Sequence, residues 1–259
     1  MRLAKVNGRK VEEYLKKSQT VLIPVGSIEN HGMHMPLGTD MLIPERIAEL
    51  IEEQYDVLIA PAVPYGATEQ INGCTGTVSL DTDGLVLVLS RITDSLYRYG
   101  FRRFIILNGH GGNNKAIETV GIRLHKRGAW LASLNWWQMA GELRPEWKGG
   151  HGGAEETAGI MGVDPSLIDQ EYLHVPMNQI NDVSDTMPTT GWTTVKYKGA
   201  TITLPRESKH YHGNGWYGTD APYLATEEWG REMLQTMADY MVDFLKEFES
   251  VPLPEKEQQ

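Results

Sequence analysis

Carboxylates and imidazoles gather in one short segment near the start of the chain. It reads E-N-H-G-M-H-M-P-L-G-T-D and contains Glu29, His31, His34 and Asp40. Imidazole and carboxylate together suit Zn²⁺, Mn²⁺ or Fe²⁺, and an aspartate can bridge two ions. The apolar run 21–25 just before it predicts a buried strand, and open α/β sheets bind ligands beyond the carboxyl ends of their strands. A polar surface loop is the simpler alternative, because short motifs often match by chance.

A second loop offers another histidine in a similar setting. The apolar run 104–107 predicts a strand, and N-G-H-G-G-N-N follows it with His110 as the third residue. Glycines let a backbone turn sharply and approach a ligand closely. A plain strand-to-helix turn needs glycine but does not need histidine. Two strand-end loops that each carry metal-type ligands therefore favour one shared site over two unrelated turns.

A third segment, H-G-G-A-E-E-T, places His151 before the carboxylates of Glu155 and Glu156 at a predicted helix start. Glutamates in a first helical turn are often no more than complements of the helix dipole. His151 is not needed for that purpose, and an imidazole beside an activated water can carry a proton. We therefore expect His151 and Glu156 to be catalytic groups.

These three segments resemble those of the creatininase (creatinine amidohydrolase) family. Two further fragments are similar to segments of that family and follow in the same order: Y-G at 65–66 with G-T-V-S-L at 76–80, and A-T-E-E-W-G at 225–230. The resemblance covers nearly the whole chain. It implies an α/β fold, a three-layer α-β-α sandwich with a mostly parallel sheet, creatininase-like.

The resemblance also implies two divalent ions per subunit, zinc or manganese, with iron as a third candidate. In creatininase itself a glutamate after N-G-H helps to hold the second ion, but this chain has Gly112 there. Glu156 or another group would have to replace that glutamate. The expected ligands are Glu29, Asp40 and His110 for one ion and His31 with Asp40 for the other, with Glu156 as a further candidate ligand.

Such a site predicts a hydrolase. Metal binding lowers the pKa of water from about 15.7 to roughly 7, so a metal-bound hydroxide can attack a carbonyl near neutral pH. His151 or Glu156 would then pass the proton to the leaving nitrogen. The expected function is a metal-dependent amidohydrolase that cleaves a C–N bond, other than a peptide bond, in a small cyclic amide or formamide. Gly112 argues against creatinine as the natural substrate.

Two other functions stay open. Family members are thought to act on other carbonyl compounds as well, which suggests hydrolysis of a C–C bond in a cyclic diketone. The chain could also be a non-catalytic metal-binding relative, although such a protein would not need His151 and Glu156 as proton carriers.

Several other residues are candidates for the substrate side of the site. His34 is expected to orient a ligand or the substrate rather than to coordinate. Trp137 and Trp147 resemble tryptophans that cover the substrate in creatininase, but large aromatics also pack in cores and interfaces. His210 and His212 have a spacing that puts both on one face of a strand, but a solvated loop is the preferred explanation because no carboxylate lies nearby in the sequence.

The remaining sequence predicts elements that alternate between strand and helix. That succession is typical of a parallel sheet with helices on both faces, and no linker divides the single domain 1–259. The expected helices are 41–54, 85–99, 115–127 and 226–248, the further strands are 57–60 and 129–134, and a hairpin is expected at 195–202.

Composition narrows the partners and the compartment. The net charge of −10 argues against nucleic acid and anionic membrane as partners, which leaves a small-molecule substrate. A single cysteine, Cys74, excludes an intramolecular disulfide and fits a reducing compartment. The first residues lack the apolar core of a signal peptide, so a cytoplasmic location is expected.

The resemblance to creatininase further implies a homo-oligomer, with a hexamer as the suspected state. Aromatic residues and methionines are concentrated between 187 and 241 in irregular sequence. Both kinds of residue are enriched at the centres of protein interfaces. We therefore expect the region 187–223 to lie at subunit contacts and close to the mouth of a pocket.

Overall fold

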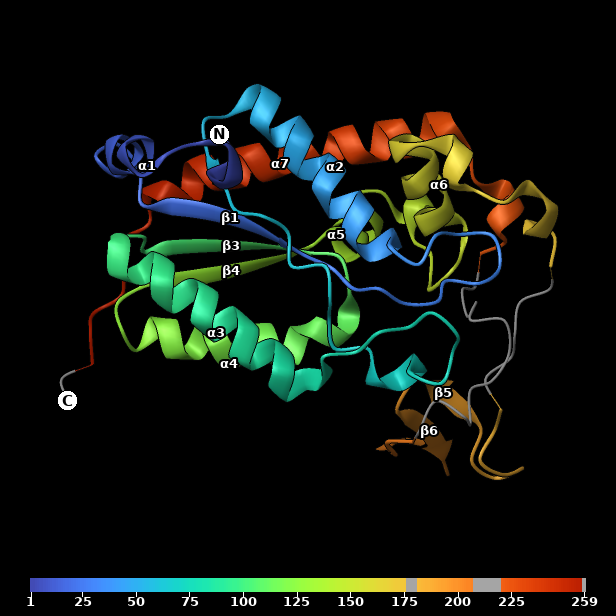
Figure 1. The fold of residues 1–259 in the computed structure, drawn as a ribbon. Coiled ribbons are helices and arrows are strands. Elements are labelled where there is room, and N and C mark those ends of the chain that lie inside the picture. The colour runs from blue at the N-terminus through green and yellow to red at the C-terminus, as the bar shows by residue number, and fades with distance from the viewer. Residues whose placement is uncertain (176–180, 207–219, 258–259) are drawn as a thin grey trace.

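The computed structural model describes residues 1–175, 181–206 and 220–257. Its centre is a four-stranded parallel sheet in the order β2-β1-β3-β4 (Figure 1). The strands are β1 (Thr20–Val25), β2 (Leu58–Ile59), β3 (Arg103–Asn108) and β4 (Trp130–Asn135). All four strands that the sequence predicted are confirmed. None of the helices in the described residues is both long and apolar enough to cross a bilayer.

The two central strands, β1 and β3, are buried on both faces, and this is why their sequences are continuous apolar runs. Successive strand residues point to opposite faces, so Leu22 enters one core while Val21 and Ile23 enter the other. The edge strands are less buried, since β2 is short and most of β4 is partly exposed.

Helices cover both faces of the sheet, which confirms the three-layer sandwich (Figure 1). One core lies beneath α2 (Thr39–Gln54), α5 (Trp136–Leu143), α6 (Ala154–Val163) and α7 (Glu227–Ser250). The other core is shared by α1 (Gly8–Leu15), α3 (Asp81–Tyr99) and α4 (Asn114–His125). Short 3₁₀ helices occupy Leu3–Lys5, Glu69–Ile71, Gly111–Asn113, Pro145–Trp147, Pro165–Leu167, Gln170–Tyr172 and Pro222–Leu224.

The order of the strands creates a crevice between β1 and β3. These strands are neighbours, but the chain leaves β1 through α2 on one face and leaves β3 through α4 on the other. Open α/β sheets bind ligands at such a point, just beyond the carboxyl ends of the strands. The first two histidine-bearing loops follow β1 and β3 directly, so both open into this crevice.

The long loop between β2 and α3 runs back alongside the loop that follows β1. Isolated bridges join Val25 to Val63 and Ile28 to Val78. The backbone N–H of Asn30 also donates to the hydroxyl of Thr77 over 3.1 Å. The long loop is thus a wall of the crevice rather than a loose connection.

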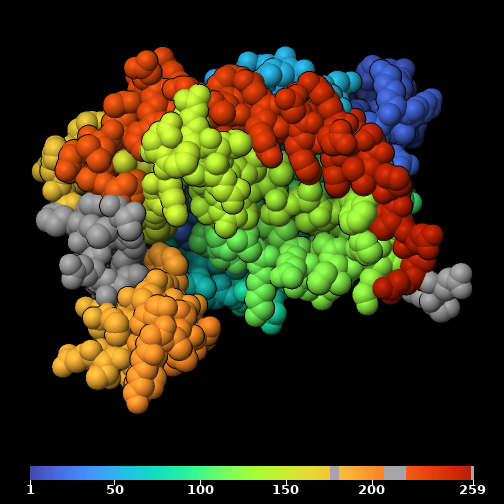
Figure 2. All heavy atoms as spheres, turned by 180° about the vertical axis from the view of Figure 1, so that it is seen from behind, coloured from blue at the N-terminus to red at the C-terminus, as the bar shows by residue number. Residues whose placement is uncertain are grey.

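A second, antiparallel sheet contains β5 (Thr189–Gly191), β6 (Thr194–Tyr197) and β7 (Ala200–Thr203). Lys198 and Gly199 join β6 to β7, and both have positive φ angles, as in the turns that suit hairpins. The hairpin predicted at 195–202 is confirmed, whereas β5 was not expected. Figure 2 shows this sheet projecting from the body of the molecule, and Figure 1 places it at the end where α6 lies.

Candidate metal centre

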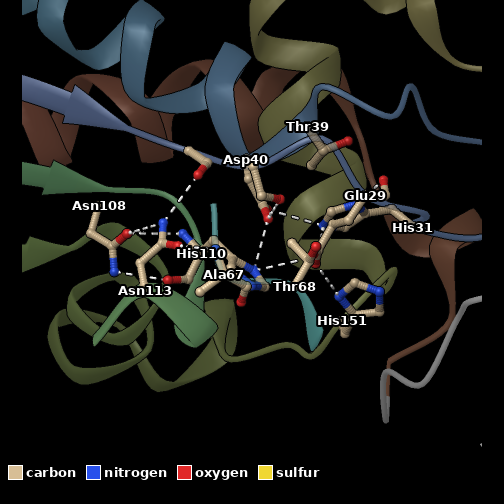
Figure 3. Close-up of polar contacts among 12 residues, drawn as sticks. Glu29, His31, Thr39, Asp40, Ala67, Thr68, Asn108, His110, Asn113 and His151 are labelled. Carbon is tan, nitrogen blue, oxygen red and sulfur yellow. Dashed lines mark hydrogen bonds and ion pairs between the residues drawn. The ribbon is translucent and has the colours of Figure 1, made fainter. Parts of the chain in front are cut away.

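The expected metal ligands converge at the crevice between β1 and β3 (Figure 3). Three groups of three have candidate ligand atoms that all lie within 4.8 Å of one another. Two of them share Asp40: Glu29, Asp40 and His110, and His31, Asp40 and Glu156. The third is Glu29, His31 and His151. Glu29, His31 and Asp40 are almost fully buried, and the side chains of His110 and Glu156 are each 12% exposed.

Asp40 belongs to two of the three groups because it lies in the first turn of α2, between the two histidine-bearing loops. Its Oδ1 lies 3.0 Å from Nε2 of His31, and its Oδ2 lies 3.1 Å from Nδ1 of His110. The hydroxyl of Ser27, just after β1, donates to Oδ2 over 2.7 Å. An aspartate held in this way can present one oxygen to each of two ions.

Each histidine at the crevice is oriented by a backbone carbonyl. Nδ1 of His31 lies 3.1 Å from the carbonyl oxygen of Glu29, and Nε2 of His110 lies 2.9 Å from that of Ala67. A carbonyl can only accept, so the facing nitrogen carries the proton and the other nitrogen of a neutral ring is left with its lone pair. That second nitrogen faces the carboxylates in both residues, the arrangement usual for metal-bound histidine.

Glycines allow the loop after β3 to pass close to its neighbours. A Cβ atom at Gly109 would lie 1.8 Å from the backbone oxygen of Asp40. A Cβ atom at Gly112 would lie 2.0 Å from the carbonyl oxygen of Ala67 and 2.5 Å from Nε2 of His110. This backbone therefore has no room for the glutamate that creatininase has after N-G-H.

Glu156 reaches the crevice from the opposite side, at the start of α6. Its Oε2 lies 3.8 Å from Nε2 of His31 and accepts the backbone N–H of Gly152 over 2.7 Å. The carboxylate that the loop after β3 lacks is thus present on another element. Its position fits the replacement expected from the sequence.

Two asparagines hold the loop that carries His110. Asn108 accepts the backbone N–H of His110 over 3.2 Å and donates to its carbonyl over 2.9 Å. Asn113 donates to the carbonyl of Gly26 and accepts the backbone N–H of Ala67. These bonds tie together the three segments around the crevice, so the asparagines of N-G-H-G-G-N position the histidine.

Burial and mutual charge set the pKa values of the cluster. Burial alone would lower the pKa of His31, but Asp40, Glu156 and Glu29 outweigh it and raise that pKa to about 10. Burial would raise the pKa of Asp40, but His31 and His110 hold it far below its usual range. Burial, opposed by His31, raises the pKa of Glu156 to about 7.

The charge pattern fits a metal centre. Within the described parts of the chain, histidines are the only basic residues within ion-pair distance of Glu29, Asp40 and Glu156. Several buried carboxylates in one place repel each other unless cations accompany them. Protons on the imidazoles fulfil that role here, and divalent ions can replace those protons.

His151 lies against the same cluster from the loop before α6. Its Nε2 bonds the carbonyl oxygen of Asn30 over 2.8 Å, so its Nδ1 is the nitrogen that faces Glu29, 3.5 Å from Oε1. Burial and the charge on His31 lower the pKa of His151 to about 4. His151 is therefore neutral near pH 7, with the lone pair of Nδ1 directed at the carboxylate of Glu29.

A pocket of about 490 Å³ opens over these residues. Trp137 lines it, as expected from the sequence. Trp192, in the turn between β5 and β6, also lines it and meets the ring of His151 edge-on, with centroids 5.5 Å apart. The sequence predicted Trp192 only as one of the aromatic residues of the region 187–223, which was expected close to the mouth of a pocket, and did not name it as a substrate-binding residue.

Two other expected substrate residues lie elsewhere. Trp147 is buried in the core beneath α7, with the guanidinium of Arg144 over its ring, and it does not line the pocket. The 3₁₀ helix Pro145–Trp147 turns the indole inward, which corrects its expected place. His34 is buried and bonds the hydroxyl of Thr157 on α6 over 3.0 Å, so it supports the helix that carries Glu156. The pair at 210 and 212 falls outside the described residues.

Comparison with known proteins identifies the family. The family model described as "Creatininase: Creatinine amidohydrolase" matches residues 4–245. The chain belongs to the creatininase family. A structure described as "Creatininase Mn" superimposes on it with a TM-score of 0.74 at 22% identity, covering 96% of this chain and 99% of the other, which shows a shared fold.

Relatives within the creatininase family carry different names. This chain is 40% identical over 114 residues to a mycofactocin precursor peptide peptidase of Mycolicibacterium smegmatis, covering 42% of this chain and 46% of the relative. It is 31% identical over 171 residues to the creatinine amidohydrolase of Pseudomonas putida, with coverages of 58% and 66%. It is 28% identical over 179 residues to a 3-dehydro-scyllo-inosose hydrolase of Thermotoga maritima, with coverages of 63% and 56%. The matches thus span about half to two thirds of these relatives.

Proposed function

We propose that this protein hydrolyses a carbon–nitrogen bond of a small amide at the pocket above Asp40. The observation that carries the proposal is the position of Asp40, with one oxygen toward His31 and the other toward His110. Glu29 and Glu156 complete the two groups of ligands. The expected ions are zinc or manganese, with iron as a further candidate, because imidazole and carboxylate suit all three.

The ions and the protein would divide the chemistry. Divalent ions held by these residues lower the pKa of a coordinated water and polarise a substrate carbonyl. His151 would act as the general base, and its support is that Asn30 fixes its Nε2 while Nδ1 is directed toward the carboxylate cluster. The same Nδ1 can then donate the proton to the leaving nitrogen. Glu156 is the second candidate for that proton, because its carboxylate lies in the same cluster, 3.8 Å from Nε2 of His31.

The size and the lining of the pocket favour a small, flat carbonyl compound as the substrate. Trp137 and Trp192 both line the pocket with aromatic surface, and the volume of about 490 Å³ is that of a small-molecule site. A cyclic amide or a formamide fits this description best. The similarity to a peptidase extends the candidates to a peptide bond.

A second candidate function is hydrolysis of a carbonyl compound without an amide nitrogen. The similarity to a 3-dehydro-scyllo-inosose hydrolase favours it, and the same residues would attack the carbonyl. Both functions require a bound metal and a general base. They differ only in the bond that breaks.

A screen for added water would test the proposal. The metal-loaded protein would be incubated with lactams, hydantoins, formamides, short peptides and cyclic diketones, and mass spectrometry would detect products heavier by one water. We expect water addition to an amide class, and we expect none with the Asp40→Asn variant. Water addition confined to diketones would favour the second candidate. Full metal loading without turnover of any class would favour a binding protein instead.

A further inference from the structure

Glu155 is a buried acid in the pocket wall that the proposed metal centre does not use. It comes four residues after His151 in sequence, is only 3% exposed and lines the pocket. Its Oε2 accepts the backbone N–H of Gly149 over 3.0 Å. Its Oε1 is buried and has no hydrogen-bond partner among the described residues. A buried polar atom without a hydrogen-bond partner destabilises the folded protein. Because Glu155 lines a pocket, a bound ligand could donate the missing hydrogen bond to Oε1.

Capping of the helix does not explain Glu155. Asp220 performs that role, because its Oδ2 accepts the backbone N–H of Glu155 over 2.9 Å. The side chain of Glu155 turns away toward Gly149, where a Cβ atom would lie 2.4 Å from the Cβ of Glu155. The chain thus leaves room for this carboxyl at the wall, although a neutral side chain would avoid the cost of its burial.

The charge around the pocket selects the kind of ligand. The described lining residues include no lysine or arginine, while Glu155 has Asp220 beside it and Glu156 next in sequence. A carboxylate on a ligand would be repelled at this wall, and a cation would be attracted. Trp137 and Trp192 add indole faces to the same pocket, and such faces also favour cations.

The number of carboxyl oxygens without a partner indicates which kind of cationic group fits Glu155. A guanidinium group pairs best with both oxygens of a carboxylate at once. Oε2 of Glu155 is already bonded to Gly149, so Oε1 is the one oxygen of this carboxyl that has no hydrogen-bond partner among the described residues. One accepting oxygen suits a compact primary ammonium group.

We propose that Glu155 is a specificity-determining residue that accepts a hydrogen bond from a primary ammonium group of the substrate. This inference rests on the proposed hydrolysis at the same pocket and names the substrate class more closely: a small amide that also carries an amine.

Calorimetry on the metal-loaded protein would test the inference with glycinamide, which carries an ammonium group, and glycolamide, which has a hydroxyl in its place. We expect wild-type protein to bind glycinamide tighter by roughly tenfold or more, as for a hydrogen bond between charged groups. Glu155→Gln should abolish the preference at unchanged metal content and melting temperature. Glu146→Gln, which removes an exposed charge nearby in sequence, should keep the preference.

Three outcomes would overturn the inference. Equal binding of the two amides by wild-type protein would do so without any variant. A preference that persists in Glu155→Gln would assign the amine to the metal ions instead. A preference lost equally in Glu146→Gln would show a general charge effect. All three outcomes are measured as binding of the two amides. They can therefore be told apart from a failure of the proposed hydrolysis, which is measured as product formation in the screen.

Discussion

The carboxylate of Glu156 at the start of α6 lies 3.8 Å from Nε2 of His31 in the loop after β1. These residues come from opposite sides of the crevice and meet at Asp40. The loop after β3 contributes His110 but no carboxylate, since Gly112 stands where creatininase has a glutamate. The second group of ligands therefore depends on the docking of α6, and substitutions that disturb this docking should affect one ion more than the other.

Substitution of Gly112 should damage the centre although it removes no ligand. In Gly112→Ala the new methyl group would meet the carbonyl oxygen of Ala67 at 2.0 Å and the ring of His110 at 2.5 Å. We expect a loss of about 1–3 kcal/mol in the free energy of unfolding, as for an overpacked site, together with weaker metal binding. Gly111→Ala is the matched control, because its nearest contact would be 3.8 Å from Trp137. If the two variants had the same free energy of unfolding and the same metal affinity, close packing at Gly112 would not be what holds His110 in position.

His151→Ala should keep its metal and lose turnover. General acid–base groups contribute roughly 10²–10⁴ in rate, so we expect kcat to fall by that range. Activity would be measured on a substrate from the screen, with metal content and melting temperature recorded beside it. If the variant instead loses an ion at unchanged stability, His151 is a ligand and another group moves the proton.

His34 should make stability depend on pH. Burial, together with the charge on His31, lowers its folded pKa from 6.5 to about 4. The unfolded chain therefore binds the proton first as the pH falls, and the stability contributed by neutral His34 is present above about 6.5 and lost toward pH 4. Between pH 7 and pH 5 the melting temperature of wild-type protein should fall more than that of His34→Gln. Parallel curves for the two proteins would show that His34 is not held neutral.

The region 187–223 is expected at subunit contacts of a homo-oligomer, with a hexamer as the suspected state. Within its described part, Trp192 already lies at the pocket, and Tyr197 and Ile202 are exposed on the projecting sheet. Light scattering at micromolar concentration should show an oligomer, and Ile202→Lys should weaken it by placing a charge at the contact. A monomer with full activity would contradict this expectation.

Much of the centre could be predicted because its parts follow local rules. Glu29, His31 and His110 come directly after apolar runs, and the carboxyl ends of neighbouring parallel strands meet at one edge of a sheet. Trp192 could not be predicted in the same way, since its approach to His151 depends on how a distant hairpin docks. Trp147 was misplaced because its nearness to His151 in sequence does not reveal the inward turn of its 3₁₀ helix.

The metal content of purified protein tests the central claim most directly. Elemental analysis after reconstitution with zinc or manganese should give two ions per chain for wild-type protein. Asp40→Ala and His110→Ala should each lose bound metal and essentially all activity, because Asp40 belongs to both groups of ligands and His110 completes one of them. Normal metal content and full activity in Asp40→Ala would contradict a centre of two ions bridged by Asp40.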